Sequence, residues 1–454
     1  MVEKVDVSLI HCGSREAIIG KKLVGSEYDV RLNVLGRFRN PMLYEISRGS
    51  GGSYHIIDTG NKENIEAVAE KCTNSDFVFI GNEAPIINGL ADVLRMRGIQ
   101  VIGPNKDFAL EGDKNKTRIL LEEIYSHANP RFYFIDPAKS QWEAMTGRAI
   151  KEMNGKVAIK PIEPKYGKGV IVEGYHFSSE QAYERALDTA KAGPFLIEEK
   201  IVGEEWSGQY LCDKKLHMQP FFASRDFKRA LENDKGENTG GMATISDNKA
   251  LLPFMKQEEF EEGIKIEEKI VKKLSDREGY EEGFLTGVKY PAFVLPGKGN
   301  KIFEHNDRGG DPEFLNALSV LKNDFVDVCF GMLEGNLPTL KFEGKAVTAL
   351  YTAPLTYGGF IRNFSGSKAI KWNKKEFSPK TEIYPGSVDL TDSGEIQILS
   401  SRSVAVVSKD DKLEESLRIA NEDIRKIDGP VRYRTNIDMD YVNKCVERMK
   451  MLRL

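Results

Sequence analysis

The sequence predicts a multidomain protein of mixed α/β and α+β class. Its 454 residues are more than one hydrophobic core normally serves, so several domains are expected. In the first hundred residues strand-like runs alternate with helix-like runs, and the remainder mixes the two less regularly. Such alternation is typical of a doubly wound parallel sheet, whereas the remainder indicates α+β domains.

Residues 1–107 are expected to form the parallel-sheet domain. The strand-like runs are VDVSLIHC, YDVRLNVLG, DFVFIG and IQVIGP, and the helix-like runs are EAIIGKKL, NIEAVAEKC and INGLADVLRMRG. Ligands of such sheets bind beyond the carboxyl ends of the strands. The candidate ends are HCGSRE, at His11–Glu16, and GNEAP, at Gly81–Pro85.

Residues 108–336 are expected to form a central domain and residues 337–454 a small α+β domain. The central helices are LEGDKNKTRILLEEIY and SSEQAYERALDTAKA, and the strands are KVAIKP, VIVEGY, PFLIEEKI and QYLCDKKLHMQPFFAS. The loop PGKGN between PAFVL and KIFEHN predicts a hairpin. The last segment carries the strand-rich runs AVTALYTAP and EIQILSSRSVAVVS, a helix at LEESLRIANEDIRKI and a charged end.

Composition favours a soluble protein that acts on small molecules. The 65 basic and 69 acidic residues nearly cancel, so there is no basic field of the kind that recruits nucleic acid. No apolar run reaches the roughly 18 residues of a membrane span, and MVEKVDVSLIHC does not resemble a signal peptide. The five cysteines include no CxxC pair, which argues against disulfides and structural zinc and favours a cytoplasmic location.

The segment EHNDRGGDPEF, Glu304–Phe314, is dense in carboxylates. Strand alternation in KIFEHN sends Glu304 and Asn306 to one face and His305 to the other. A carboxylate and an amide oxygen at this spacing suit a hard cation such as Mg²⁺, with substrate phosphates completing its shell. His305 is expected to pack behind the site, and a solvated acidic turn is the alternative interpretation of the whole segment.

Three further segments have a chemical and a plain interpretation. VAIKPIEPKYGKGVIV combines lysines with a glycine-rich loop that could approach phosphates, although Ile162 excludes a Walker A loop and an ordinary hairpin turn would look similar. LIEEKIVGEEW places acid pairs where ribose hydroxyls could bind, but acidic turns are common. SRDFKRALENDKGENTGGM is read as a long polar loop, and loops of this kind are more often functional than not.

Taken in order, GNEAP, LEGDK, KPIEPKYGKGV, IEEKIVGEE, SRDFKRALENDKGENTGGM, FEHNDRGGDPE and YRTNID resemble the phosphoribosylamine–glycine ligases of purine biosynthesis. The resemblance covers essentially the whole chain. It implies a Rossmann-like N-terminal domain, an ATP-grasp central domain with a mobile lid at about residues 128–198, and an α+β C-terminal domain. It also implies that ATP phosphorylates the glycine carboxylate and that 5-phosphoribosylamine attacks the acyl phosphate, giving glycinamide ribonucleotide, ADP and phosphate.

The resemblance also implies roles for individual residues. The residues implied to bind ATP are Lys114, Lys160, Gly167, Lys168, Gly169, Glu198, Glu199 and Glu205, with Lys168 in the lid and Glu205 at the ribose. Those implied to bind Mg²⁺ or Mn²⁺ are Glu304 and Asn306. Those implied to act in catalysis are Arg308, Asp226 and Lys228. Those implied to bind the substrates are Gly13, Arg15, Glu83, Asn238, Thr239, Gly240 and Asp311.

Departures from the family motifs gather near the expected acceptor pocket. The family loop GxGGREHA reads HCGSREAI here, with His11 and Ser14 in place of glycines and Ala17 in place of the histidine. The family motif NCRFGDPE reads NDRGGDPE here. Further single-residue departures are at Asn82, Phe227 and Ala243, and the segments TAPLTYGGF and LSSRS replace two other family motifs. The first interpretation is a divergent ligase of the same activity. An ATP-grasp paralogue joining another amine and carboxylate is the second, and a non-catalytic nucleotide-binding regulator is the third.

The expected partners are the small-molecule substrates, with no nucleic acid and no membrane. We expect a monomer that could make transient contact with the enzyme producing phosphoribosylamine.

Overall fold

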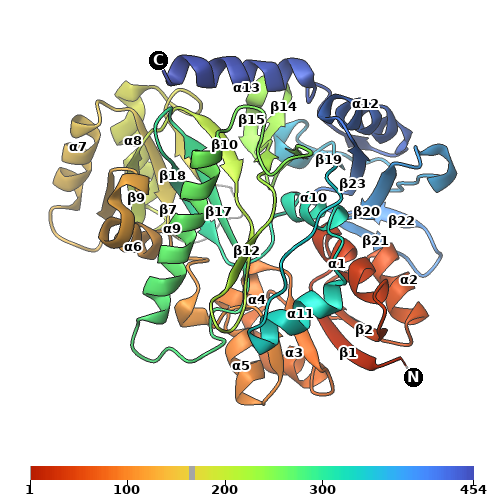
Figure 1. Cartoon of the computed structure of the whole chain (residues 1–454). Helices are drawn as coiled ribbons and strands as arrows, with labels where there is room; N and C mark the ends of the chain where they lie inside the picture. The colour runs from red at the N-terminus through yellow and green to blue at the C-terminus, as the bar shows by residue number, and fades with distance from the viewer. Residues whose placement is uncertain (1, 163–168) are drawn as a thin grey trace.

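The computed structural model describes residues 2–162 and 169–454 (Figure 1). In Figure 1 the N-terminal segment, in red and orange, lies at the bottom. The segment of about residues 128–198, called the lid segment after the role that the resemblance implies, lies at one side, and the blue C-terminal segment lies along the top and the opposite side. Among the described residues, none of the helices is both long and apolar enough to cross a membrane. The expected class, a mixed α/β and α+β multidomain protein, is confirmed.

The N-terminal segment is a parallel sheet in the order β3-β2-β1-β4-β5. Its strands are β1 (Lys4–Ile10), β2 (Asp29–Gly36), β3 (Tyr54–Ile56), β4 (Phe77–Ile80) and β5 (Gln100–Ile102). Its helices are α1 (Ser14–Val24), α2 (Pro41–Gly49), α3 (Ile65–Lys71), α4 (Glu83–Ile87) and α5 (Leu90–Met96). The predicted doubly wound sheet is therefore confirmed, while β3 and α2 were not foreseen.

Both faces of this sheet are buried, as its continuous apolar strands require. Leu9 and Phe79 pack in one core with α1 and with α11 (Phe325–Glu334), whereas Ile10 and Ile80 pack in another with α3 and α5. Helix α2 starts after Asn40 because that side chain accepts hydrogen bonds from the next backbone N–H groups, at Met42 and Leu43. Because β1 and β4 are paired in parallel from Val7 with Phe77 to Ile10 with Ile80, their carboxyl ends lie next to each other.

The lid segment is an antiparallel sheet in the order β6-β9-β7-β8 with two helices on one face. Its elements are β6 (Phe132–Ile135), α7 (Trp142–Glu152), β7 (Val157–Pro161), β8 (Ile171–Val172), α8 (Ala182–Ala190) and β9 (Phe195–Glu199). Ile159 and Ile197 lie in the core formed with α7 and α8. Strand alternation therefore places Lys160 and Glu198 on the opposite face.

The central sheet has the order β10-β17-β11-β12, with β18 also pairing with β17. Its elements are α6 (Lys114–Tyr125), β10 (Glu204–Ser207), β11 (Tyr210–Cys212), β12 (Met218–Pro220), α9 (Gln257–Ser275), β17 (Gly287–Leu295) and β18 (Lys301–Asn306). The predicted hairpin is confirmed as β17 and β18. The single strand expected from QYLCDKKLHMQPFFAS is wrong, because Asp213 accepts hydrogen bonds from the N–H groups of Lys215 and His217 and closes a turn between β11 and β12.

A further sheet, β13-β16-β19-β23-β20 with β24 beside β19, joins strands from both sides of residue 336. Its strands are β13 (Arg225–Asp226), β16 (Ala243–Ser246), β19 (Ala346–Pro354), β20 (Thr381–Pro385), β23 (Val404–Asp410) and β24 (Val431–Arg432), and it is accompanied by α10 (Glu313–Ser319) and α12 (Leu413–Asp423). The central and C-terminal segments therefore share one sheet. Their side chains can meet in a single site.

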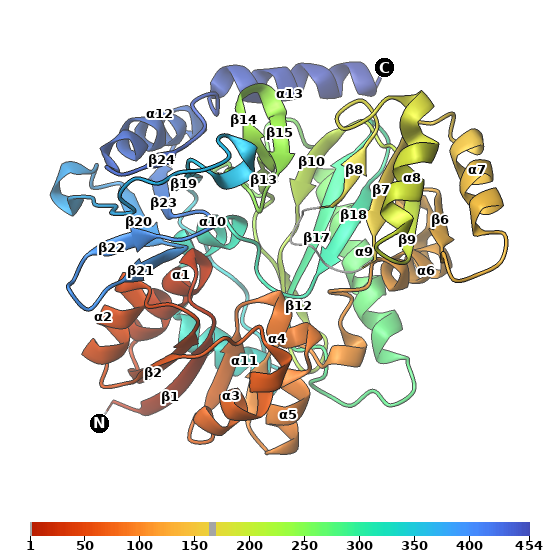
Figure 2. The same ribbon diagram turned by 180° about the vertical axis from the view of Figure 1, so that it is seen from behind.

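Two hairpins and a long helix complete the fold. The segment expected to be a polar loop contains the hairpin of β14 (Arg229–Leu231) and β15 (Lys235–Asn238), so that expectation was wrong in detail. The second hairpin joins β21 (Val388–Leu390) and β22 (Ile396–Ile398). The charged end forms α13 (Met439–Leu452), and Asp438 caps the N-terminus of this helix. Helix α13 lies along the top of the molecule in both views (Figures 1 and 2). Short 3-10 turns are η1 (Lys62–Asn64), η2 (Lys106–Phe108), η3 (Ser126–Ala128), η4 (Ser179–Gln181), η5 (Glu232–Asp234), η6 (Tyr357–Gly359), η7 (Lys374–Glu376) and η8 (Ile424–Lys426).

Candidate active site

The strand β18 carries Glu304 and Asn306 at its C-terminal end. The Asn306 side-chain amide donates to the Tyr290 carbonyl oxygen at 3.3 Å, which leaves its own oxygen facing Arg308 Nη2 at 3.5 Å. His305 points away and its Nε2 lies 3.0 Å from Glu267 Oε1 on α9. Burial alone would lower the pKa of His305, but the Glu267 and Asp307 carboxylates raise it overall. The histidine is thus a packed residue behind the strand.

Positive side chains from three other segments surround Glu304. Lys228 Nζ, just after β13, lies 3.3 Å from Glu304 Oε1. Lys228 is the main cause that lowers the pKa of Glu304 to about 2, and Lys114 and Lys160 act in the same direction against burial. Glu304 is therefore ionised at any pH near neutrality, and the lysines that face it form an anion-binding surface.

Lys160 is also part of a buried triad. Glu198 on β9 accepts from Arg118 Nε through Oε1 and from Lys160 Nζ through Oε2, both at 2.7 Å. Burial opposes ionisation of Glu198, but the two cations keep its pKa below the ordinary value. With Lys114 and Lys228 this makes four cationic groups against the two carboxylates Glu198 and Glu304. The surplus positive charge suits a polyphosphate.

The other predicted acidic residues of the nucleotide region differ in environment. Glu199 is next to Glu198 but faces outward, where Oε2 pairs with the exposed Arg131 at 2.9 Å. On β10, Glu204 is fully buried between Arg225 and Arg448, whereas Glu205 is half-buried and close enough to raise the pKa of Lys228. Glu205 therefore acts on Lys228, whereas Glu199 pairs with a surface arginine.

The predicted lid residues are only partly described. Gly167 and Lys168 lie outside the described residues. Gly169 has a φ of +98°, a conformation that favours glycine.

Arg308, two residues beyond Asn306, is held between two carboxylates. Its Nε lies 3.2 Å from Glu83 Oε2 at the start of α4, and its Nη2 lies 3.7 Å from Glu111 Oε1. Burial raises the pKa of Glu111 to about 7, while Arg308 opposes that rise. Burial also acts against ionisation of Glu83, but Arg308 and Arg15 keep the Glu83 pKa below its ordinary value. Arg308 thereby links the N-terminal sheet to the end of β18.

The segment after β1 carries two of the residues expected to bind the substrates, Gly13 and Arg15. The Gly13 N–H donates to Glu16 Oε2 at 2.7 Å, and Arg15 pairs with Glu16 Oε1 at 2.8 Å. Arg15 Nη1 also donates to the Gly309 carbonyl oxygen at 2.8 Å, so this buried guanidinium braces the loop after β18. His11, where the family motif has glycine, has a φ of +88°, which is strained for a side-chain-bearing residue.

Asp226 and the Gly240–Gly241 turn form another part of the candidate site. Asp226 is buried, its Oδ1 has no hydrogen-bond partner among the described residues, and burial together with Glu313 raises its pKa well above the ordinary value. Gly241 has a φ of +108°, and a Cβ there would lie 2.5 Å from Asp226 Oδ1. The turn therefore needs glycine to approach this carboxyl group.

Backbone and side-chain hydrogen bonds shape the rest of this part of the site. Thr239, which follows Asn238 at the end of β15, donates through Oγ1 to the Lys228 carbonyl oxygen at 2.8 Å and accepts from the Gly241 N–H at 3.1 Å. The Gly240 N–H donates to Tyr357 Oη at 3.2 Å. Thr239 thus fixes the position of Lys228.

Asp311 joins three distant segments. Its Oδ1 accepts from Tyr351 Oη of β19 and from Ser14 Oγ, the latter at 3.4 Å, while Oδ2 pairs with Arg402 Nη2 at 3.1 Å. Arg402 Nη1 also donates to the carbonyl oxygens of Gly240 at 2.7 Å and Gly241 at 2.9 Å. Ser14, the second change from glycine in the loop, is therefore used to tie the loop to the C-terminal sheet.

The donor set at Glu304 and Asn306 fits a hard cation. One ligand is an ionised carboxylate and the other is an amide oxygen whose orientation is fixed by the Tyr290 carbonyl. Within the described ranges, no group of three or more His, Cys, Asp and Glu side chains could hold a metal ion. A cation at this pair would therefore need further oxygen ligands from a bound nucleotide.

Several contacting residues were missed from the sequence. Arg118 lies four residues after Lys114, one helical turn along α6, so helix spacing could have found it. Glu111 precedes Lys114 in the same motif. Arg402 and Tyr351 lie far along the chain and carried no local signal.

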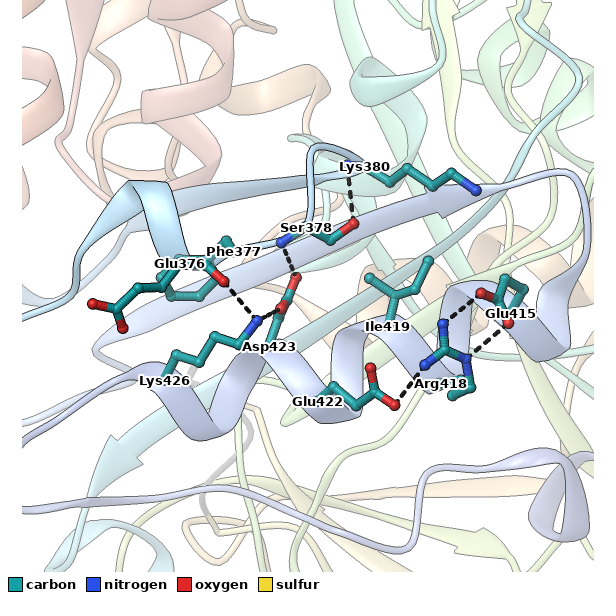
Figure 3. Close-up of a pocket in the computed structure, with 10 residues that line it drawn as sticks. All are labelled: Glu376, Phe377, Ser378, Lys380, Glu415, Arg418, Ile419, Glu422, Asp423 and Lys426. Atoms are coloured by element: carbon teal, nitrogen blue, oxygen red, sulfur yellow. Dashed lines mark hydrogen bonds and ion pairs between the residues drawn. The ribbon is translucent and has the colours of Figure 1, made fainter.

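A separate surface pocket of about 390 Å³ lies between η7 and α12 (Figure 3). Five of its charged residues pair with one another: Arg418 bridges Glu415 and Glu422, and Lys426 bonds Asp423. None of its lining residues belongs to the candidate site.

The antiparallel sheet of the lid segment supplies Lys160, which acts on Glu304 together with Lys114 and Lys228. This arrangement beside a carboxylate–amide pair is that of an ATP-grasp protein, and the family comparison agrees. The ATP-grasp (A) domain of phosphoribosylglycinamide synthetase matches residues 136–314, and the N domain of the same family matches residues 5–111.

Curated relatives and solved structures give the family. A phosphoribosylamine–glycine ligase of Methanocella arvoryzae is 34% identical over 98% of this chain and 99% of that protein, and one of Pyrococcus furiosus is 33% identical over 99% and 98%. The crystal structure of the Thermotoga maritima phosphoribosylamine–glycine ligase superposes with a TM-score of 0.75 at 21% identity, covering 95% of this chain and all of that one. The chain belongs to the phosphoribosylglycinamide synthetase family, and the resemblance seen in the sequence motifs is confirmed.

Proposed function

We propose that the protein is the ATP-dependent ligase that joins glycine to 5-phosphoribosylamine, giving glycinamide ribonucleotide, ADP and phosphate in purine biosynthesis. Full-length relatives that bear the name phosphoribosylamine–glycine ligase support this activity. The observation that carries it is the convergence of Lys114, Lys160 and Lys228 on Glu304. A carboxylate held ionised among lysines suits the phosphoryl transfer with which the reaction begins.

The cation cluster would bind the ATP phosphates. Lys160 is oriented by Glu198 and by the Phe303 carbonyl oxygen, to which its Nζ donates at 3.1 Å. Lys114 is the first residue of α6, and its Nζ lies 3.5 Å from the Ile162 carbonyl oxygen. Both ammonium groups are therefore held by the protein before the nucleotide arrives, which limits the reorganisation needed during transfer. Lys168, Gly167 and Gly169 would cover the phosphates from the lid.

The adenosine would lie against the lid strands. Glu205 is our candidate for the ribose hydroxyls because it is half-buried and near Lys228. The side chains of Glu198 and Glu199 are occupied by Arg118 and Arg131. We therefore assign these two residues to holding β9 and its cations in place.

Glu304 and Asn306 would hold Mg²⁺, or Mn²⁺, together with the phosphates. A solved neighbour with this fold, a biotin carboxylase domain from Hydrogenobacter thermophilus with a TM-score of 0.69, is described in complex with MgADP. When bound, the cation would neutralise phosphate charge.

The first step would join the glycine carboxylate to the γ-phosphorus of ATP. A carboxylate oxygen bonds to phosphorus as the bond to the β–γ bridging oxygen breaks, and ADP leaves. Lys228 pairs with Glu304, and Arg308 also acts to lower the Glu304 pKa, so both cations would neutralise charge on the transferring group. Asp226, whose Oδ1 has no hydrogen-bond partner among the described residues and whose pKa is affected by the charge of Lys228, would position the glycine amino group.

The second step would form the amide. The phosphoribosylamine nitrogen bonds to the carbonyl carbon of glycyl phosphate, the bond from that carbon to the phosphate oxygen breaks, and the nitrogen loses a proton. Glu83, Gly13 and Arg15 surround the end of β1, where the ribosyl group would bind. Asn238, Thr239, Gly240 and Asp311 would form the opposite wall.

The setting of the reaction follows from its substrates. All are small molecules, and the five cysteines are free and buried, which fits a reducing cytoplasm. We propose a monomer that makes at most transient contact with the enzyme supplying the labile amine.

The direct test is product analysis by mass spectrometry. Purified protein is given Mg-ATP, glycine and phosphoribosylamine formed in the reaction from ribose 5-phosphate and ammonia. Glycinamide ribonucleotide in equal amount to ADP supports the proposal. ATP binding without that product would refute the assignment of glycine and phosphoribosylamine and favour a paralogue that uses another amine or carboxylate, since the departures from the family lie around His11 and Ser14.

A further inference from the structure

Asp307 lies between Asn306 and Arg308, and its side chain is completely buried. Its Oδ1 lies 2.6 Å from Lys289 Nζ of β17, and neither side chain has any exposed surface. The family motif that this segment resembles, NCRFGDPE, has a cysteine at this position. A buried ion pair carries a large desolvation cost, and apolar residues of similar volume are often at least as stable. Stability alone is therefore a weak reason for the pair.

The second oxygen of Asp307 is used to hold the segment before α6. Oδ2 accepts from the N–H groups of Leu110 at 2.7 Å and Glu111 at 3.0 Å. In the other direction, the Asp307 N–H donates to Glu111 Oε2 at 2.6 Å. These three hydrogen bonds fix both the backbone and the carboxylate of Glu111.

Glu111 in turn contacts Arg308 through its other oxygen, at 3.7 Å from Nη2. The charged groups that face Glu111 are Arg308, Glu83, Asp307 and Lys114. Burial is the largest cause that raises the pKa of Glu111, and the charges of Glu83 and Asp307 act in the same direction. Arg308 and the hydrogen bond from the Asp307 N–H lower it, and the net result is a pKa of about 7. The charge on Glu111, and with it the balance around Arg308, therefore depends on Asp307.

We propose that Asp307, held by Lys289, is a positioning residue that fixes Glu111 against Arg308 and so orients the Arg308 guanidinium for the reaction. The kinetic test of this inference rests on the proposed function. The structural test does not depend on the proposed function, because the hydrogen bonds exist without substrates.

Two double variants separate charge from hydrogen bonding. Lys289→Met with Asp307→Asn removes both charges together but keeps an oxygen that can accept from Leu110 and Glu111. Lys289→Met with Asp307→Val removes the acceptor as well. Because both charges leave together, neither variant strands a lone ion in the core.

We expect the Asn variant to keep kcat within about threefold of the wild type and the Val variant to lose at least tenfold, with the KM for ATP within about twofold in both. In the Asn variant the loss of a neighbouring negative charge lowers the Glu111 pKa, so the acidic limb of the kcat profile moves to lower pH. If Asp307 had only a packing role, the two variants would have the same kcat and the acidic limb of the kcat profile would stay at the same pH.

The matched control is a second ion pair, Glu259 of α9 with Arg453, whose Oε2 and Nη2 atoms are 2.6 Å apart and far from Arg308 in sequence and fold. Glu259→Gln with Arg453→Met should lower the unfolding temperature and leave kcat and the pH profile unchanged. If the Val variant behaves like this control, the proposal is overturned.

The substrate-free readout is thermal unfolding between pH 5 and pH 8. A carboxyl group with a raised pKa loses stabilisation as pH rises from its unfolded value towards its folded value, and this loss should shrink in the Asn variant. Asp307 also raises the pKa of His305, whose Nδ1 lies 3.8 Å from Asp307 Oδ2, so the comparison is repeated in a Glu111→Gln background, where the part of the shift due to Glu111 should be absent. An unchanged pH dependence would overturn the proposal. If the wild type makes no glycinamide ribonucleotide while this shift is seen, the proposed function has failed and the positioning contact has not.

Discussion

The buried triad of Arg118, Glu198 and Lys160 offers a strong test of how the lid is held. We consider Glu198→Gln, which keeps the size of the side chain and removes its charge. Glu198 and Arg118 are each 1% exposed, and both carboxylate oxygens are 2.7 Å from a cation. Glutamine can still accept one hydrogen bond through its oxygen. Its amide nitrogen, however, would face the other cation as a donor.

The expected cost follows from the burial of the partners. Removing one partner of a buried ion pair destabilises a protein by about 3–5 kcal/mol, because the other charge is left without compensation. If the cooperative unit has 150–250 residues, each kcal/mol corresponds to about 2–4 °C, so the unfolding temperature should fall by roughly 6–20 °C. The effect is fully present at neutral pH, since a carboxylate with a lowered pKa loses its contribution only in acid.

The measurement is thermal and urea unfolding, with ATP affinity measured on the folded protein. Lys160 loses the partner that orients it, so ATP should bind at least tenfold more weakly. The adjacent residue provides the control: Glu199 pairs with Arg131, whose side chain is 66% exposed, and such surface pairs contribute about 0–1 kcal/mol. Glu199→Gln should therefore lower the unfolding temperature by only a few degrees at most.

If Glu198→Gln and Glu199→Gln lower the unfolding temperature by equally small amounts, the inference that Glu198 holds the buried triad is refuted. The same holds if Glu198→Gln destabilises the protein but leaves ATP affinity unchanged, because Lys160 would then not depend on Glu198 for its position.

Three further changes have defined outcomes. Glu304→Ala should abolish formation of glycinamide ribonucleotide while leaving the circular dichroism spectrum intact, and unchanged Mg²⁺-dependent turnover would contradict the metal assignment. Glu111→Gln should remove a carboxyl group whose pKa is raised to about 7 and which therefore destabilises the wild type as pH rises. The stability of the variant relative to the wild type should increase from pH 5 to pH 8 by up to about 3 kcal/mol, at about 1.4 kcal/mol per pKa unit. A constant difference between the two proteins across that range in denaturant titrations would contradict this expectation. His11→Gly should stabilise the fold by about 1 kcal/mol because φ is +88°, and a simultaneous rise in the KM for phosphoribosylamine would show that the imidazole contacts the substrate, whereas lower stability would refute the strain.

The regular parts of the fold could be predicted from local patterns. The alternating runs before residue 107 gave the parallel sheet, and the glycine-containing loop PGKGN gave the β17–β18 hairpin. Period-two alternation also separated Glu304 and Asn306 from His305. These predictions succeeded because each depends on neighbours in the sequence and on which face of a strand is buried.

Errors arose where side chains or distant strands decided the local structure. Asp213 breaks the run after Tyr210 by accepting hydrogen bonds from nearby N–H groups. The SRDFKR segment forms strands because β13 finds β16 as a partner and β14 finds β15. Neither partner can be recognised from composition alone.

The sequence by itself determined the class of the protein, its family and the residue types of the candidate site. Only the tertiary structure decided how those residues are used: that Glu198 holds Arg118 and Lys160, that Arg15 braces the loop at Gly309, and that Asp307 is neutralised by Lys289. The physical reason is that the charge state and orientation of a buried ion depend on which opposite charge lies within a few ångströms. That proximity is set by contacts between segments far apart in the chain.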